Sequence, residues 1–207
     1  AASVNKLPIL AALYYNTQKG EIDLDRVVTI QEKDIQDYGT GSIRYDTPGA
    51  TYSVKTLAKL MTQQSDNTAA YILANHIVGM SDIQKLVDSW GLTQTDMANN
   101  KTSNHDIAIL FKKLYKREVA GEAYTLEMLS FLKDTDFEDR LPALLPDTAT
   151  VYHKIGTEVG VLHDTGIVNH ASLVYYIGIL TTDVDNEEEA IQIAAEISKI
   201  VYDYLKR

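Results

Sequence analysis

The sequence has no cysteine, and this absence removes three kinds of chemistry. It excludes a disulfide framework, a zinc site built on thiolates and a cysteine nucleophile. The chain also lacks any run of 18 or more apolar residues, so no segment is predicted to span a membrane. Of its 207 residues, 45% are hydrophobic, which is enough to bury a core.

Positive charge is scarce as well. The 19 lysines and arginines face 29 acidic residues, which gives a formal net charge of −10. Such a surface repels a phosphate backbone, so nucleic acid is not expected as a partner. The five histidines show no HExxH spacing and are expected to be structural or surface residues, and neither a metal nor another cofactor is predicted. They are His76, His105, His153, His163 and His170.

The hydrophobic pattern changes once along the chain. Up to Pro146 the apolar residues recur mainly at helical spacing, whereas three β-rich runs and one amphipathic helix follow. We expect one α+β domain over residues 1–207, with a mostly helical lobe over about 1–146. An antiparallel sheet backed by the C-terminal helix is expected over about 147–207. The helices before the sheet are predicted at 3–17, 54–64, 67–78, about 81–89, 104–117 and 122–133.

Three short polar motifs interrupt this pattern. In "SVNK", Ser3 and Lys6 lie three residues apart and therefore share a helix face. "SDN" occupies residues 65–67, and "KIGT" occupies residues 154–157 at the end of a predicted strand. Taken singly, each motif has a structural explanation: Ser3 and residues 65–67 are good helix caps, Lys6 is a solvated first-turn residue, and "KIGT" is a strand followed by a turn.

Taken together and in this order, the three motifs resemble the set found in penicillin-recognising serine hydrolases, most closely the class A β-lactamase branch. The stretches "GEIDLDRVVTI", "YGTGSIRYDTPGATYSVKTLAKLMTQQSDNTAAYIL", "LPALLP" and "HDTGIV" are similar to that family at the same places in the order. The resemblance covers nearly the whole chain. It implies the β-lactamase/transpeptidase-like fold, a location outside the cytoplasm, and action on β-lactams or D-alanyl peptides.

The resemblance also implies a division of catalytic roles. Ser3 would be the nucleophile and Lys6 its base, for which the lysine needs a pKa far below the usual value near 10.4. Burial and a second nearby cation both lower a lysine pKa, and the family places Lys154 in the same cleft. Ser65 would relay the proton to the leaving nitrogen.

The same comparison assigns substrate contacts to four residues. Asn67 would hydrogen-bond the amide side chain of the substrate, while Lys154 and Thr157 would meet its carboxylate. Gly156, which lies between those two, is also expected at the substrate site. The backbone N–H groups of Ser3 and Thr157 would form the oxyanion hole.

Two departures from the family pattern bear on turnover. The glutamate that activates the deacylating water in class A enzymes is missing from "TQTDMANNK", where Asp96 and Asn100 keep the spacing of four residues. Asp96 is therefore the candidate deacylation base, and Glu158 is a second one. Ile155 stands where the family usually has a hydroxyl residue, so weaker recognition of the substrate carboxylate is expected unless Thr157 compensates. We expect acylation with slow deacylation; the alternative is a penicillin-binding sensor or binding module without useful turnover.

A third departure concerns the start of the chain. The family has a helix and two strands before its serine helix, whereas here the serine is the third residue. We expect either that an N-terminal segment is missing or that a separate segment completes the sheet. Without such a segment, self-association is expected through exposed apolar surface.

Overall fold

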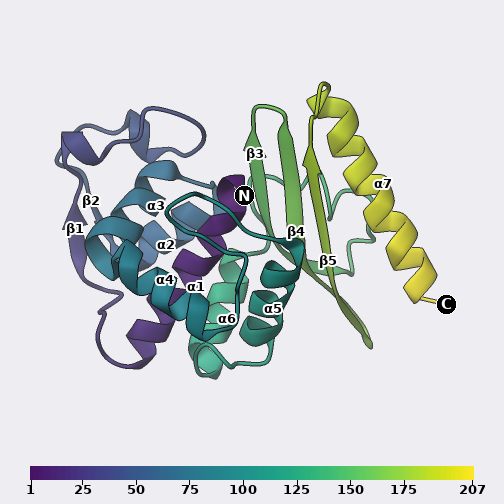
Figure 1. The fold of residues 1–207 in the computed structure, drawn as a ribbon, viewed down its shortest axis with the longest axis horizontal. Coiled ribbons are helices and arrows are strands. Elements are labelled where there is room, and N and C mark those ends of the chain that lie inside the picture. The colour runs from purple at the N-terminus through teal and green to yellow at the C-terminus, as the bar shows by residue number, and fades with distance from the viewer.

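A helical lobe and a sheet form the two halves of the computed structural model, which describes all 207 residues (Figure 1). The chain begins in the middle of the molecule, beside strand β3 (Thr150–Glu158), and ends on the far side of the sheet. The predicted α+β fold is confirmed. None of the helices combines the length and the apolar composition that a membrane span requires.

The first helix is the centre of the helical lobe. It starts as a 3₁₀ turn over Ala2–Asn5 and continues as α1 over Lys6–Gln18. Leu7, Leu10 and Leu13 are at most 1% exposed. Because apolar or small residues occur all round α1, the other helices surround it.

The remaining helices begin close to the predicted positions. Ser53 and Asp66 cap α2 and α3 by accepting hydrogen bonds from backbone N–H groups three residues on. The predicted helix over 67–78 is divided, since α3 ends at Ile72 and the chain continues as a π-helix to Val78. The bounds are α2 (Val54–Gln63), α3 (Asn67–Ile72), the π-helix (Leu73–Val78), α4 (Met80–Ser89), α5 (Asn104–Tyr115) and α6 (Glu122–Phe131).

A small two-stranded sheet was not predicted. Strand β1 (Val27–Thr29) lies in "RVVTI", whose residues favour a short extended run. Its antiparallel partner β2 (Thr51–Ser53) lies in "DYGTGSIRYDTPGATYS", where turn residues such as Pro48 and Gly49 favour a loop. Two 3₁₀ turns, Glu32–Asp34 and Ile43–Tyr45, lie between these strands.

The main sheet is the predicted three-stranded meander. Strands β3, β4 (Val161–His170) and β5 (Leu173–Thr182) pair antiparallel in that order, with Lys154 opposite Thr165 and Ile155 opposite Asp164. Helix α7 (Glu187–Leu205) packs against β4 and β5 on the side away from the helical lobe (Figure 1). A small second core, which includes Val168 and Tyr202, lies between them.

Apolar side chains remain exposed on helix α7. On α7 they follow the helical spacing of one face, with exposed fractions of 38–67% for Ile193, Ile197 and Ile200 and 69% for Tyr204. The expectation that a further segment or a second copy covers this region stays a prediction.

Candidate active site

Ser3 lies in the 3₁₀ turn that precedes α1, with its side chain partly exposed in a cavity. Its side chain caps no backbone N–H, so the capping explanation does not hold. Ala2, directly before it, has a left-handed φ of 47°. Strand β3 passes so close that a Cβ on Gly156 would lie 3.2 Å from the Ser3 nitrogen. Gly156 thus permits the contact between the strand and the serine turn.

Lys6 is buried, not solvated, with 7% of its surface exposed. Its Nζ donates to the backbone oxygen of Ser65, to Ser65 Oγ at 3.1 Å and to Asn67 Oδ1 at 2.7 Å. Burial disfavours the ammonium form and lowers the pKa of Lys6 to about 7, although the nearby Asp66 carboxylate acts in the opposite direction. A large neutral fraction is therefore present at neutral pH, as a general base requires.

Ser65 connects two lysines. Its Oγ accepts a hydrogen bond from Lys154 Nζ at 3.0 Å as well as the one from Lys6. Burial, followed by the nearby charge of Lys6, holds the pKa of Lys154 well below its ordinary value. Ser65 has a left-handed φ of 54°, a conformation that costs a serine roughly 1 kcal/mol or more. The turn between α2 and α3 thus holds this hydroxyl at the meeting point of two amines that compete for protons.

Asp66 and Asn67 fix the loop that carries Ser65. The buried Asp66 carboxylate accepts hydrogen bonds from the backbone N–H groups of Ile43 at 2.9 Å and Ala69 at 2.8 Å, so it ties the loop to neighbouring backbone. Asn67 Nδ2 donates to the Tyr38 carbonyl at 2.9 Å, while its Oδ1 faces Lys6.

Arg140 is a site residue that the sequence analysis missed. It is 3% exposed and donates from Nη2 to Thr157 Oγ1 at 2.9 Å and from Nη1 to the His163 carbonyl at 3.0 Å. A permanent cation therefore lies against the hydroxyl that was predicted to meet a substrate carboxylate. A single arginine in an irregular stretch has no periodicity that marks it in advance.

A cluster of charged residues, in which His153 and Asp164 are buried and Glu138 is exposed, lies under the same strand. His153 Nδ1 is 2.9 Å from Asp164 Oδ1, and its Nε2 is 3.1 Å from Glu138 Oε1. Burial alone disfavours the charged imidazole, but the two carboxylates outweigh burial and raise the pKa of His153 to about 9. Asp164 also accepts a hydrogen bond from the Leu141 N–H at 3.1 Å. The cluster thus ties β3, β4 and the loop before β3 together.

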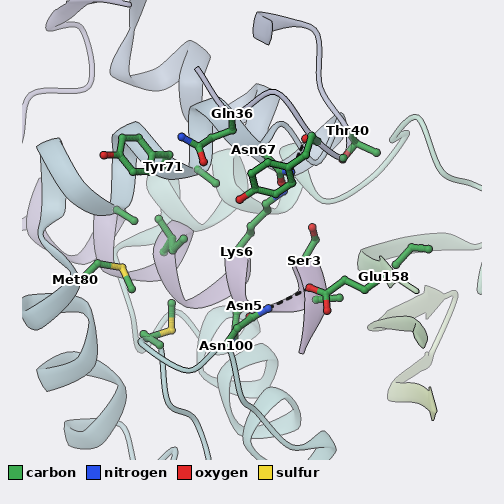
Figure 2. A pocket seen from close by; sticks show the side chains of 18 of the residues that line it. Ser3, Asn5, Lys6, Gln36, Thr40, Asn67, Tyr71, Met80, Asn100 and Glu158 are labelled. Carbon is green, nitrogen blue, oxygen red and sulfur yellow. Dashed lines mark hydrogen bonds between the residues drawn. The ribbon is translucent and has the colours of Figure 1, made fainter. Parts of the chain in front are cut away.

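The two candidate deacylation bases occupy different environments. Asp96 does not line the cavity, and its carboxylate accepts hydrogen bonds from the Asn99 side chain at 2.7 Å and the Asn99 N–H at 3.0 Å. These bonds hold the pKa of Asp96 below its ordinary value. Glu158 does line the cavity, where its Oε1 accepts a hydrogen bond from Asn100 Nδ2 at 3.3 Å (Figure 2).

The cavity itself has a volume of about 810 Å³. At one end it is lined by Ser3, Thr157 and Glu158, and it continues past Lys6 to Tyr71 and Met80, as Figure 2 shows. Ser65 and Lys154 are not part of the lining; they are buried next to Lys6. The structure therefore brings the "SVNK", "SDN" and "KIGT" motifs together at one end of an elongated cavity.

Comparison with known proteins agrees with this geometry. The model of the Beta-lactamase enzyme family matches residues 1–205, and the chain belongs to this family. β-Lactamase VEB-1 of Pseudomonas aeruginosa is 21% identical over 228 residues, covering 98% of this chain and 76% of that protein. The structure of PBP-A is similar with a TM-score of 0.91 and 28% identity, covering 100% of this chain and 81% of that one. A mutant of PBP-A has been solved as an acyl-enzyme complex with penicillin G, with a TM-score of 0.90.

Proposed function

We propose that this protein is a serine hydrolase that forms an acyl-enzyme on Ser3 with β-lactams or D-alanyl-type peptides and releases the product slowly. The observation that carries the proposal is the buried Lys6, one turn after Ser3, with a pKa of about 7. The penicillin acyl-enzyme of the PBP-A mutant supports the choice of substrate. A location outside the cytoplasm, where such substrates occur, is part of the proposal.

In the acylation step the neutral amine of Lys6 takes the proton of the Ser3 hydroxyl as Oγ attacks the carbonyl carbon. The carbonyl electrons move to oxygen, where the N–H groups of Ser3 and Thr157 would receive the negative charge. The C–N bond then breaks as the carbonyl re-forms. The leaving nitrogen takes a proton through Ser65, which Lys6 or Lys154 replaces. The products are an ester on Ser3 and a free amine.

Substrate orientation would come from both sides of Ser3. A carboxylate would be placed near Thr157, where the permanent cation Arg140 contributes positive potential. Because Arg140 donates to the Thr157 hydroxyl, that hydroxyl is free to direct its own proton to the carboxylate. This arrangement compensates for the absence of a hydroxyl at Ile155. On the other side, Asn67 would hold the substrate amide.

Slow hydrolysis of the acyl-enzyme is expected because neither carboxylate near the site is held in position to activate a water molecule. Asp96 is engaged in its own turn, and Glu158 is exposed and bound only through Asn100. The same observation favours a second function, a penicillin sensor that is acylated once and does not turn over.

The experiment that tests the proposal measures product formation over time with the substrate in molar excess over the protein. We expect a burst of one equivalent from penicillin G, followed by slow linear turnover that disappears in Ser3→Ala. A burst without a linear phase would support the sensor. Release of D-alanine from a diacetyl-lysyl-D-alanyl-D-alanine peptide would identify the peptide as a substrate. No burst with either compound would refute the proposed function.

A further inference from the structure

The far end of the cavity, away from Ser3, is an apolar arm that none of the catalytic roles uses. It is more than a surface groove, because Ile9, Ala74 and Met97 in its wall are only 4–7% exposed. We define the inner arm by the apolar residues that line it beyond Lys6, namely Ile9, Ala70, Tyr71, Ala74, Met80 and Met97. The side-chain amide of Gln36 also lines the cavity here, next to Tyr71 (Figure 2).

The shape of the inner arm follows from three helices. Ile9 lies one turn beyond Lys6 on α1 and so continues the lining from the catalytic lysine. Ala70 and Ala74 are four residues apart and present only methyl groups, the second of them from the π-helical segment. Met80 begins α4 and lies, like Tyr71, at the end of the cavity away from Ser3 (Figure 2). Small residues on one wall and a flexible methionine on the other leave an open space.

The chemistry of the lining selects the occupant. Lys6 and Glu158 are the only charged residues that line the whole cavity, and neither belongs to the inner arm. The anion-binding groups Thr157 and Arg140 lie at the opposite end. A substrate whose carboxylate faces Thr157 therefore directs its other end, the acyl substituent, towards the inner arm.

We propose that the inner arm is a subsite for an apolar acyl substituent, such as an unbranched alkyl chain or a single aryl ring. This inference rests on the proposed function, since it assigns the acyl side of the same substrate. It predicts selection by chain length, because each buried methylene contributes about 0.8 kcal/mol, which is roughly fourfold in affinity.

The test compares acylation rates, by intact mass, for penicillins that carry acetyl, hexanoyl or decanoyl groups on the 6-amino nitrogen. We expect wild-type protein to react at least about tenfold faster with the hexanoyl than with the acetyl compound. Ala74→Leu fills the inner arm and should reduce this ratio to below about threefold. Met80→Ala lengthens the arm and should move the optimum to the decanoyl compound. Ala123→Leu, on an exposed face of α6, is the matched control and should behave as wild type.

Two outcomes separate this inference from the proposed function. Adducts that form at equal rates with all three compounds would overturn the subsite and leave acylation standing. If no adduct forms, calorimetric binding of the same compounds to Ser3→Ala decides. Affinity that rises with chain length and is lost in Ser3→Ala/Ala74→Leu would support the subsite while the acylation proposal fails, whereas chain-independent binding would overturn both.

Discussion

The pH dependence of acylation follows from the burial of Lys6. Lowering the pKa from 10.5 to about 7 corresponds to about 5 kcal/mol of destabilisation of the ammonium form. At about pH 7.5, roughly three-quarters of the Lys6 amines are then neutral, compared with about one in a thousand for an ordinary lysine. The acylation rate should therefore be nearly constant above pH of about 8 and fall about tenfold per pH unit well below the pKa.

Lys6→Met is the matching perturbation, since methionine has a similar length and no base. Losing a general base should slow acylation by roughly 10²–10⁴-fold. The variant loses the three hydrogen bonds from Lys6 Nζ, but it also removes an amine whose charged form is costly to bury, and the second effect offsets the first. Its midpoint of thermal unfolding is therefore expected to equal or exceed that of the wild type.

Stopped-flow mixing with a chromogenic β-lactam, over about pH 5–9, measures the acylation rate directly. A rate that does not change over this range would refute the assignment of Lys6 as the base. So would a Lys6→Met variant that keeps its fold and reacts within about threefold of wild type.

The remaining predictions concern three further parts of the structure. Ser65→Ala should slow acylation by about 10²-fold, because the leaving nitrogen loses its proton relay while Lys6 keeps a low pKa; an unchanged rate would exclude the relay. Glu158→Gln should lengthen the lifetime of the adduct more than Asp96→Asn does, as followed by intact mass, and the reverse order would restore Asp96 as the base. His153 has a raised pKa in the fold, so its stabilising contribution is complete below about pH 6.5 and about 3 kcal/mol is lost as the pH rises through about 9. Denaturant unfolding of wild type and His153→Ala measures this contribution to stability. Near pH 6 the variant should be less stable by roughly 3–5 kcal/mol, because Asp164 loses its buried counter-charge. Equal stability of the two proteins at that pH would contradict the ion-pair account.

Local sequence signals predicted most of the fold. Helix caps at Ser53 and Asp66 act through bonds to N–H groups three residues away, so they are visible within a short window. The three strands after Pro146 were equally clear, because short connections favour an antiparallel meander. Strand β2 was missed since its three residues lie between turn residues and are specified mainly by pairing with β1.

The active site depended on contacts between distant segments. The local explanation of Ser3 and Lys6 as a cap and a solvated lysine was wrong, because burial of Lys6 comes from the "SDN" loop 59–61 residues away. The order of the three motifs indicates that they lie together in the fold, but it does not predict the charges and pKa values at the site. His153 had no local signal, since its partners Glu138 and Asp164 lie 15 and 11 residues away. The inner arm could not be predicted from the sequence, because a cavity depends on how side chains from several helices pack and on the space that they leave unfilled.

The most direct test of the central claim is the intact mass of the protein over time after mixing with excess penicillin G, beside Ser3→Ala. The account predicts that wild-type mass increases by one penicillin, that peptide mapping places the adduct on Ser3, and that the adduct disappears slowly once free drug is removed. Ser3→Ala should gain no mass. An unmodified wild-type protein with intact drug, or an adduct that also forms on Ser3→Ala, would contradict the assignment of Ser3 as the nucleophile.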